Sequence, residues 1–188
     1  MDIQLGLESG TVRVVPHDAR WARLYSEEAA RIHDALGSVK LRVALEHTGS
    51  TAVPELHAKP IIDILGGWHH DGDRELLIAA IQELGYVHRG EQEIPGRDFF
   101  RRGNPRQYHL HLTKRRGAFW REHLAFRDLL RSDAAIADAY GALKQELARM
   151  HPRDRTAYID GKTDFVLDSL RRARELGLYG DDEPRLRS

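Results

Sequence analysis

Residues 43–65 read VALEHTGSTAVPELHAKPIIDIL, and this stretch decides the fold. Its first residues alternate between apolar and other side chains, a pattern typical of a half-buried strand. That strand leads into a Gly49-Ser50 turn, and an apolar run follows at residues 60–68. Because this run is apolar on both faces, it predicts a fully buried strand. One carboxylate, Asp63, interrupts it.

The Gly-Ser turn and Asp63 together suggest a phosphate site. A turn beside a short helix start exposes backbone N–H groups that suit a phosphate. An acid on the next strand suits Mg²⁺ or another divalent cation that bridges to that phosphate. Two structural alternatives stay open. The turn also fits an ordinary strand-to-helix connection, and Asp63 also fits a buried salt bridge with Lys59, four residues earlier.

Outward from this stretch, the periodicity alternates between strands and helices. Before it we expect a short strand at 11–15, a helix from Asp18 to Leu36 that ends at Gly37, and a strand from residue 39. After it we expect a helix at 75–84 and strands at 86–89, 98–102 and 107–114. Three helices complete the chain: 118–131, 133–150 capped by Ser132, and a last one capped by Asp154.

This order predicts an α+β fold, with one mixed sheet flanked by helices and a helical C-terminal third. We expect a single domain at 11–177, with its sheet core at about 39–115 and its C-terminal helices at about 118–177. Residues 1–10 and 178–188 are expected to be flexible termini.

The composition is that of a globular protein. Of the 188 residues, 41% are apolar and 31% are charged, and 29 basic residues balance 29 acidic ones. This neutral total makes nucleic acid an unlikely partner. The chain has no cysteine, which excludes disulfides and thiolate catalysis. We see neither a signal peptide nor an apolar run of the ~20 residues that a membrane helix needs, so we expect a cytoplasmic protein without a membrane partner.

The strand predicted at 107–114 carries two histidines. A period of two places Tyr108 and Leu110 on one face and His109 with His111 on the other. Two imidazoles spaced in this way can share a metal ion or contact one phosphate, although they also fit a solvated sheet face. If this strand lies beside that of Asp63, the three side chains form a shared site.

Several motifs resemble the GrpB family: residues 46–54, 58–64, 109–112 and 123–128, the Leu143-Lys144 pair, and Lys162-x-Asp164-Phe165. The resemblance covers about residues 11–175. It implies an α/β fold of the nucleotidyltransferase superfamily, of the DNA polymerase beta type.

The superfamily pattern is a Gly-Ser turn, an acid-x-acid pair on the next strand and a third acid on a neighbouring strand. Carried over, Gly49 and Ser50 match the turn and Asp63 matches the first acid. Leu65 occupies the position of the second acid, and the third strand offers His109 and His111 instead. The resemblance therefore implies at most one divalent ion, and it leaves open whether the protein is an active transferase.

We therefore expect a protein that binds a nucleotide or another phosphorylated small molecule between the sheet and the C-terminal helices, and that transfers a nucleotidyl group if it is catalytic. The expected catalytic residues are Asp63, Ser50 and Lys59. The expected phosphate ligands are Gly49, Ser50, Thr51, Arg97, Arg101 and Lys144, and the expected metal ligands are Asp63, His109 and His111. Two alternatives stay open: an inactive binding or accessory module, and a metal-dependent hydrolase. The sequence names neither the nucleotide nor the oligomeric state.

Overall fold

The computed structural model describes residues 4–179 of the chain. Five strands form one mixed sheet in the order β1-β2-β5-β4-β3, in which β2 and β5 are parallel and the other neighbours are antiparallel. They are β1 (Val43–Thr48), β2 (Ile62–Trp68), β3 (Val87–His88), β4 (Arg97–Arg102) and β5 (Tyr108–Lys114).

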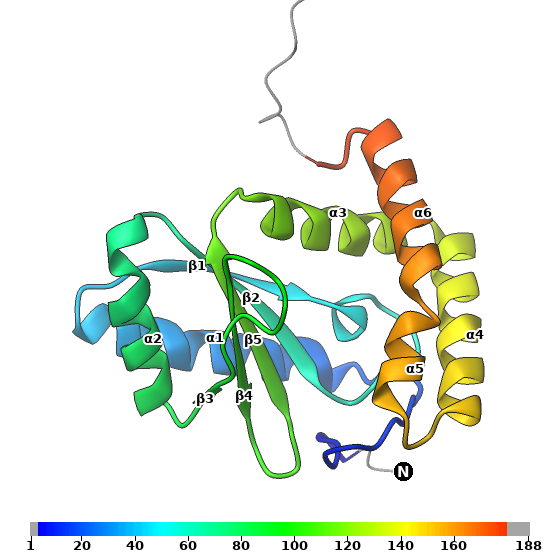
Figure 1. Cartoon of the computed structure of the whole chain (residues 1–188), viewed down its shortest axis with the longest axis horizontal. Helices are drawn as coiled ribbons and strands as arrows, with labels where there is room; N and C mark the ends of the chain where they lie inside the picture. Colours follow the sequence, from blue (N-terminus) through cyan, green and yellow to red (C-terminus); the bar gives the residue numbers. More distant parts are fainter. Residues whose placement is uncertain (1–3, 180–188) are drawn as a thin grey trace, which may run out of the picture.

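Six α-helices surround this sheet (Figure 1). They are α1 (Arg20–Ser38), α2 (Arg74–Glu83), α3 (Ala118–Ser132), α4 (Ala134–Met150), α5 (Arg155–Asp160) and α6 (Thr163–Glu175). Helix α1 packs on β1 and β2, whereas α3 packs on β1 and β5 from the opposite face. Helices α4, α5 and α6 stand together at one end of the sheet, at the right of Figure 1. No helix within residues 4–179 is long and apolar enough to cross a membrane.

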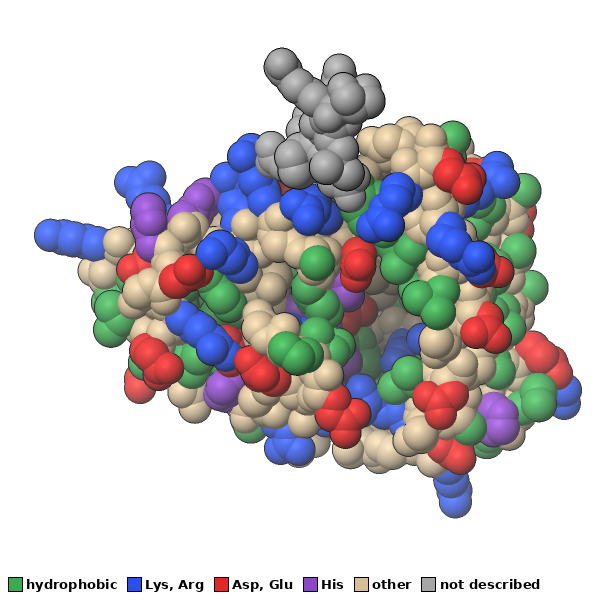
Figure 2. All heavy atoms as spheres, turned by 45° about the horizontal axis from the view of Figure 1, so that its top comes forward, with side chains coloured by type: hydrophobic (Ala, Val, Ile, Leu, Met, Phe, Trp, Pro, Cys, Tyr) green, Lys and Arg blue, Asp and Glu red, His purple; other side chains and the backbone are tan. Residues whose placement is uncertain are grey.

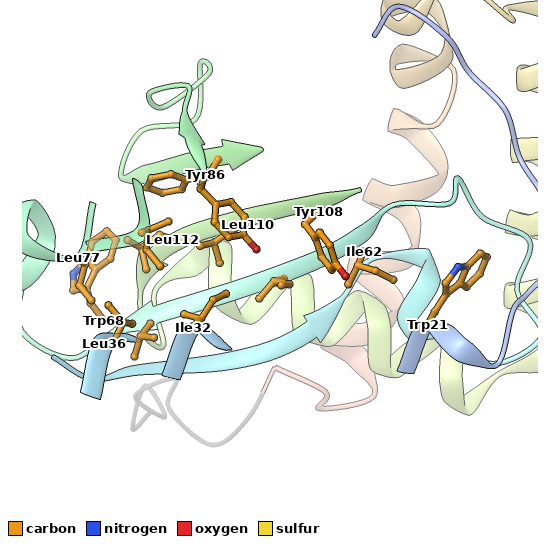
Figure 3. Close-up of a cluster of buried hydrophobic side chains, with 14 of the residues drawn as sticks. Trp21, Ile32, Leu36, Ile62, Trp68, Leu77, Tyr86, Tyr108, Leu110 and Leu112 are labelled. Atoms are coloured by element: carbon orange, nitrogen blue, oxygen red, sulfur yellow. The ribbon is translucent and has the colours of Figure 1, made fainter. Parts of the chain in front are cut away.

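The main hydrophobic core lies between the sheet and α1, with α2 closing its edge (Figure 3). Every second residue of β2 and β5 points into it, including Ile62, Ile64 and Leu110, which are fully buried. From α1, Ile32 and Leu36 meet them because a spacing of four residues keeps both on one helical face. The alternation in the strands and the period of the helix therefore agree on this core.

On the opposite face, α3 lies directly on the sheet. A Cβ added at Gly67 of β2 would come within 2.6 Å of Cζ3 of Trp120 in α3, so no larger residue fits there. The sheet is thus covered on both sides, and the second cover belongs to the helical C-terminal third. The predicted α+β class, with its mixed sheet and C-terminal helices, is confirmed.

Three local predictions were wrong. Residues 11–15 form no strand, and only Val15 makes an isolated bridge, to Ala58. The first long strand begins at Val43 rather than 39, because α1 continues to Ser38 and Lys40 takes a left-handed turn with φ 60°. Asp133, not Ser132, caps α4 by accepting from the N–H of Ile136 at 3.1 Å.

The segments expected to be flexible and the last predicted helix also differ in part. Leu7 is buried and pairs with Arg106, so part of the leader is anchored, while residues 1–3 and 180–188 lie outside the described part. Asp154 caps α5 as predicted, but the helix ends at Gly161 before α6 begins. A Cβ at Gly161 would lie 2.5 Å from Cδ2 of Leu147, so α4 and the α5–α6 junction make a close approach.

Candidate functional site

The register of the strands aligns four polar residues in a row across the sheet. Thr48 of β1 lies opposite Asp63 of β2, Asp63 lies beside His109 of β5, and His109 lies opposite Arg101 of β4. Side chains of such neighbours point the same way. This row therefore lies on the face covered by α3, which we call the site face. The strands of Asp63 and the two histidines are therefore neighbours, which is the condition under which the three side chains can share a site.

Asp63 forms a hydrogen bond with His109 and a longer polar contact with His111. Nδ1 of His109 lies 3.0 Å from Oδ1 of Asp63, and Nε2 of His111 lies 3.9 Å from the same oxygen. Burial on its own would raise the pKa of Asp63, but the hydrogen bonds from His109 and His111 outweigh it and hold the pKa below its ordinary value. Burial lowers the pKa of His109 to about 4, so this imidazole is neutral at pH 7 and donates from Nδ1.

The group fits a metal ion poorly. Both histidines converge on one oxygen of one carboxylate, and Leu65, where the resemblance implied a second acid, is fully buried. Among residues 4–179, no group of three or more Asp, Glu, His or Cys side chains is placed to hold a metal ion. A divalent ion at Asp63, His109 and His111 stays a prediction, and the donors present are those of a hydrogen-bonded carboxylate.

The Gly49-Ser50 turn packs directly against Asp63. Gly49 has φ 68° and ψ −171°, a combination that is essentially restricted to glycine, and a Cβ here would lie 2.6 Å from Oδ2 of Asp63. The predicted approach of the turn to the acid is therefore present. Thr51 is different. Its hydroxyl is buried and lies 3.1 Å from Nε2 of His47, so it points away from the site and cannot hold a phosphate there.

Lys144 reaches Ser50 from α4. Its Nζ donates to Oγ of Ser50 at 2.8 Å and to the carbonyl oxygen of His57, and it lies 4.5 Å from the centre of the Tyr140 ring. The side chain is 2% exposed. Burial, followed by repulsion from Lys162 and Lys59, lowers the pKa of Lys144 to about 7. Lys144 thus lies beside Ser50, and its role as a phosphate ligand stays a prediction.

Two more lysines point into the same region. Nζ of Lys59 lies 5.2 Å from the centre of the Tyr158 ring, and Nζ of Lys162 lies 4.6 Å from it. Burial, and then repulsion from Lys59, lowers the pKa of Lys162 to about 8; burial also lowers the pKa of Lys59. We call Lys59, Lys144 and Lys162 the lysine cluster. Within residues 4–179, none of the three forms an ion pair with a carboxylate.

This corrects the alternative in which Lys59 forms a salt bridge with Asp63. Asp63 lies close enough to favour the charged forms of Lys59 and Lys162, but its hydrogen bonds go to the histidines. One acid therefore faces three amines. The imbalance leaves the region positive.

Arg97 and Arg101, both expected as phosphate ligands, have different surroundings. Arg101 extends the positive region toward Arg155 and Arg106. Burial, followed by repulsion from these two arginines, lowers the pKa of Arg101 to about 10, so its guanidinium is still charged at pH 7. Arg97 instead holds a loop: its Nη2 donates to the carbonyls of Glu91 and Gln92. The geometry thus keeps Arg101 as a candidate phosphate ligand and assigns Arg97 to support.

Helix α3 fixes the Gly-Ser turn from above. Nη1 of Arg127 donates to Oε2 of Glu46 at 2.8 Å and to the carbonyl of His47 at 3.0 Å, just before the turn. Arg131 donates to the carbonyl of Ala52, just after it, from two nitrogens at 2.9 and 2.7 Å. Charge-assisted bonds on both sides of the turn keep Ser50 in place.

A cavity of about 380 Å³ opens beside the turn. Its polar edge includes Thr48, Gly49, His123 and Arg127, and its apolar walls come from α3, α6 and the loop before β4: Ile94, Phe119, Phe126, Leu130, Val166 and Leu170. Figure 2 shows the molecule hollowed between the sheet part and the C-terminal helices, with basic, acidic and histidine side chains on the floor. Asp63, whose side chain is 30% exposed, remains accessible.

The predicted site residues did not include Tyr140, Tyr158 or Lys162. Two signals point to them. Tyr140 and Lys144 are four residues apart on the apolar side of α4, and a lysine at such a position indicates a buried amine. Gly161 precedes Lys162 at the point where the chain must pass close to α4.

Comparison with known proteins is consistent with the motifs. The family described as GrpB protein matches residues 11–172. Glutamate-rich protein GrpB of Alkalihalophilus pseudofirmus is 34% identical over 88% of this chain and 98% of its own length. A UPF0157 protein of Pseudomonas aeruginosa is 40% identical over 86% of this chain and 67% of its own length.

A solved structure agrees with these relatives. The crystal structure of conserved protein GrpB from Enterococcus faecalis matches with a TM-score of 0.80 and 34% identity, over 88% of this chain and 99% of that one. UPF0157 protein YqkA of Bacillus subtilis is 34% identical over 82% of this chain, which spans only 45% of that longer protein. The chain described here belongs to the GrpB family.

Proposed function

We propose that the chain binds a phosphate-bearing small molecule in the hollow between the site face and helices α4–α6. The observation that carries this proposal is the lysine cluster: three inward-pointing amines that have no carboxylate partner among the described residues. Burying a charge is costly unless it is paired, and each lowered pKa is a measure of that cost. A bound anion removes the cost.

A phosphate suits this site better than a singly charged anion. The cluster supplies up to three positive charges, and Arg101, Arg106 and Arg155 continue the positive region beyond it. A phosphate group carries one to two negative charges and several acceptor oxygens. The hydroxyl of Ser50, 2.8 Å from Nζ of Lys144, adds a donor at the same place. Several phosphate oxygens can therefore be neutralised together.

The cavity beside Gly49 is suited to the rest of the ligand. It is lined by aromatic and aliphatic side chains with few polar groups, which is the usual character of a small-molecule pocket. We therefore propose a ligand with a phosphate at the lysine cluster and an apolar or aromatic group between α3 and α6. A nucleotide has this division, in line with the implied superfamily.

The resemblance also implies nucleotidyl transfer, and the residues of the site favour this reaction less than they favour binding. Two-metal transfer uses several carboxylates to clamp two ions. Of the two strand acids on the site face, Glu46 is paired with Arg127 at 2.8 Å and Asp63 bonds to neutral His109, while Leu65 takes the place of the second acid. For the same reason the residues present do not favour a metal-dependent hydrolase. Binding is the function we propose.

Thermal unfolding tests the proposal. Sulfate, phosphate, pyrophosphate and ATP are compared with chloride at equal ionic strength. A ligand that binds the native state raises the midpoint by mass action, by about 2.7 kcal/mol of stability at 100 times its Kd. We expect a rise that is larger for ligands with more phosphates, and that Lys59→Met and Lys162→Met remove most of it.

Lys114→Met is the matched control. This lysine is exposed and pairs with Asp71 at 2.9 Å, outside the hollow, so its loss should leave the anion response unchanged. The proposed function is wrong if none of the anions stabilises the protein more than chloride does. It is also wrong if Lys59→Met and Lys162→Met respond to the anions as the parent does.

A further inference from the structure

Ser50 and Lys144 have a geometry that phosphate binding alone does not require. Oγ of Ser50 lies 2.8 Å from Nζ of Lys144, and the same Nζ is anchored by the carbonyl of His57. Tyr140 lies beside both; burial raises the pKa of its hydroxyl, so that this group stays protonated next to Ser50. A hydroxyl, an oriented amine and a second hydroxyl thus meet at one point.

We propose that Ser50 is a nucleophile, that Lys144 accepts its proton, and that the electrophile is the phosphorus atom of a phosphate ester held by the lysine cluster. The pairing of a serine with a general base in hydrogen-bond reach is the arrangement that activates this weak nucleophile. The choice of phosphorus as the electrophile rests on the proposed function, whereas the serine–lysine pair stands on its own geometry.

Lys144 is suited to accept a proton near neutral pH. Its surroundings disfavour the charged ammonium: burial is the largest cause, and Lys162 and Lys59 add repulsion, so that its pKa falls to about 7. The other polar groups that face it are the Tyr140 ring, the His57 carbonyl and Ser50 itself. Asp63 acts on Lys59 and Lys162 rather than on Lys144 directly. A large share of Lys144 is therefore unprotonated at pH 7 to 8.

The backbone holds Ser50 as a nucleophile needs to be held. Gly49 before it has the glycine-restricted φ of 68° and ψ of −171°, and Asp63 closes the space where a side chain would be. Serine nucleophiles of other enzyme classes also follow a sharp, strained turn after a strand. The bond from Arg131 to Ala52 fixes the far side of the turn. Reorientation of the hydroxyl therefore costs little at the moment of reaction.

The proposed reaction consumes water and needs no other co-reactant. Oγ of Ser50 forms a bond to phosphorus, its proton passes to Nζ of Lys144, and the bond from phosphorus to the ester oxygen breaks. That oxygen leaves with the electron pair and takes the proton from Lys144. Water then attacks the phosphoserine and gives a proton to Lys144, and the bond from phosphorus to Oγ breaks. Oγ leaves with the electron pair and takes the proton from Lys144, which releases Ser50, the neutral amine and inorganic phosphate. Lys59 and Lys162 offset the charge on the phosphoryl oxygens.

A fluorophosphonate tests the nucleophile directly, because Oγ bonds to its phosphorus and fluoride leaves. The full chain is incubated with the probe from pH 5 to 9 and the labelled peptide is found by mass spectrometry. We expect a label on Ser50, at a rate that rises with pH around a midpoint near 7. Lys144→Met should slow labelling about 100-fold or more, the usual contribution of a general base. Ser132→Ala should not change it.

A second variant separates this inference from phosphate binding. Lys144→Arg keeps a positive donor but cannot accept a proton at these pH values. It should retain sulfate stabilisation and lose the label. If the parent is labelled at Ser50 but sulfate does not stabilise it, the proposed function fails and the nucleophile stands. If sulfate stabilises it and Ser50 is labelled no faster than Ser132, the nucleophile is refuted.

Two further results would also refute the nucleophile: labelling of Ser50 that Lys144→Arg leaves unchanged, or a rate that does not depend on pH between 6 and 8. Circular dichroism of each variant confirms that it is folded. Should Lys144→Met unfold, the pH profile of the parent and the Lys144→Arg variant still decide the question.

Discussion

The two faces of the sheet treat buried charge in opposite ways. On the face of α1, Glu28 is 4% exposed and is fully paired: Arg31 donates to it at 2.7 Å, Tyr86 at 2.8 Å, and Arg102 from β4. On the site face, Arg127 is paired with Glu46, but the lysine cluster has one nearby acid, Asp63, which bonds to His109 instead. Glu28, which supports the fold, is therefore balanced by its partners, whereas the lysine cluster, where we propose that the ligand binds, has an excess of positive charge. Four predictions test this contrast.

The largest effect is expected on the balanced face. Glu28→Gln leaves two arginines without their counter-charge in a buried setting and should cost about 3 kcal/mol of unfolding free energy. Urea unfolding measures it. Glu27→Gln is the control, since Glu27 pairs with Arg23 on the exposed side of the same helix and such pairs are worth about 0.5 kcal/mol or less. Equal losses for both variants would remove the contrast on this face.

The Gly-Ser turn should be the next most sensitive place. Gly49→Ala forces a Cβ to within 2.6 Å of Oδ2 of Asp63 in a backbone conformation that only glycine adopts freely, so we expect a loss of about 2 kcal/mol or more. Gly72→Ala is the matched control, because a Cβ there meets nothing within 4 Å. A tolerated Gly49→Ala variant would mean that the turn does not press against the acid.

The unbalanced face should respond with the opposite sign. Lys162→Met removes a repelling charge and keeps an aliphatic chain over Tyr158, so stability without any anion should rise by about 1 kcal/mol. The same variant should bind sulfate more weakly. A loss of stability in Lys162→Met would show that the cluster serves the fold in the same way as Glu28 does.

The last expected effect is a pH slope. The pKa values of Lys144 and Lys162 are about 7 and about 8 in the folded protein, below the ordinary 10.5. At pH values between those of the folded protein and 10.5, the unfolded chain binds more protons than the folded protein does. The free energy of unfolding therefore rises with pH from about 7 to 9. Saturating sulfate, which favours the charged form of Lys162, should reduce the slope. A slope that sulfate leaves unchanged would indicate another titrating group.

Much of the sheet could be predicted from the sequence because its signals are local. The apolar run around Asp63 and the alternation in Tyr108-His109-Leu110-His111 specify two strands and the face that each side chain takes. One piece of nonlocal information, the parallel pairing of β2 with β5, then brings Asp63 to His109. The motifs of the family supplied the expectation that these strands belong to one site.

Lys59 and Lys144 were among the expected site residues, but the grouping of the three lysines could not be predicted in the same way. Its members come from the connection before β2, from α4 and from the α5–α6 junction, and no periodicity links elements so far apart. The direction of the Thr51 side chain could not be predicted either. The three-residue turn at Ser50–Ala52 determines whether this hydroxyl faces the core or the hollow. Such features depend on packing rather than on local pattern.

Calorimetry with sulfate at pH 8 tests the central claim most directly, because sulfate itself does not titrate there. The titration is run in two buffers that differ in ionisation enthalpy, which reveals protons taken up on binding. If the lysine cluster holds the anion, sulfate binds with proton uptake, because Lys162 becomes charged, and Lys162→Met takes up fewer protons. Absence of binding, or binding with no proton uptake, would contradict the account.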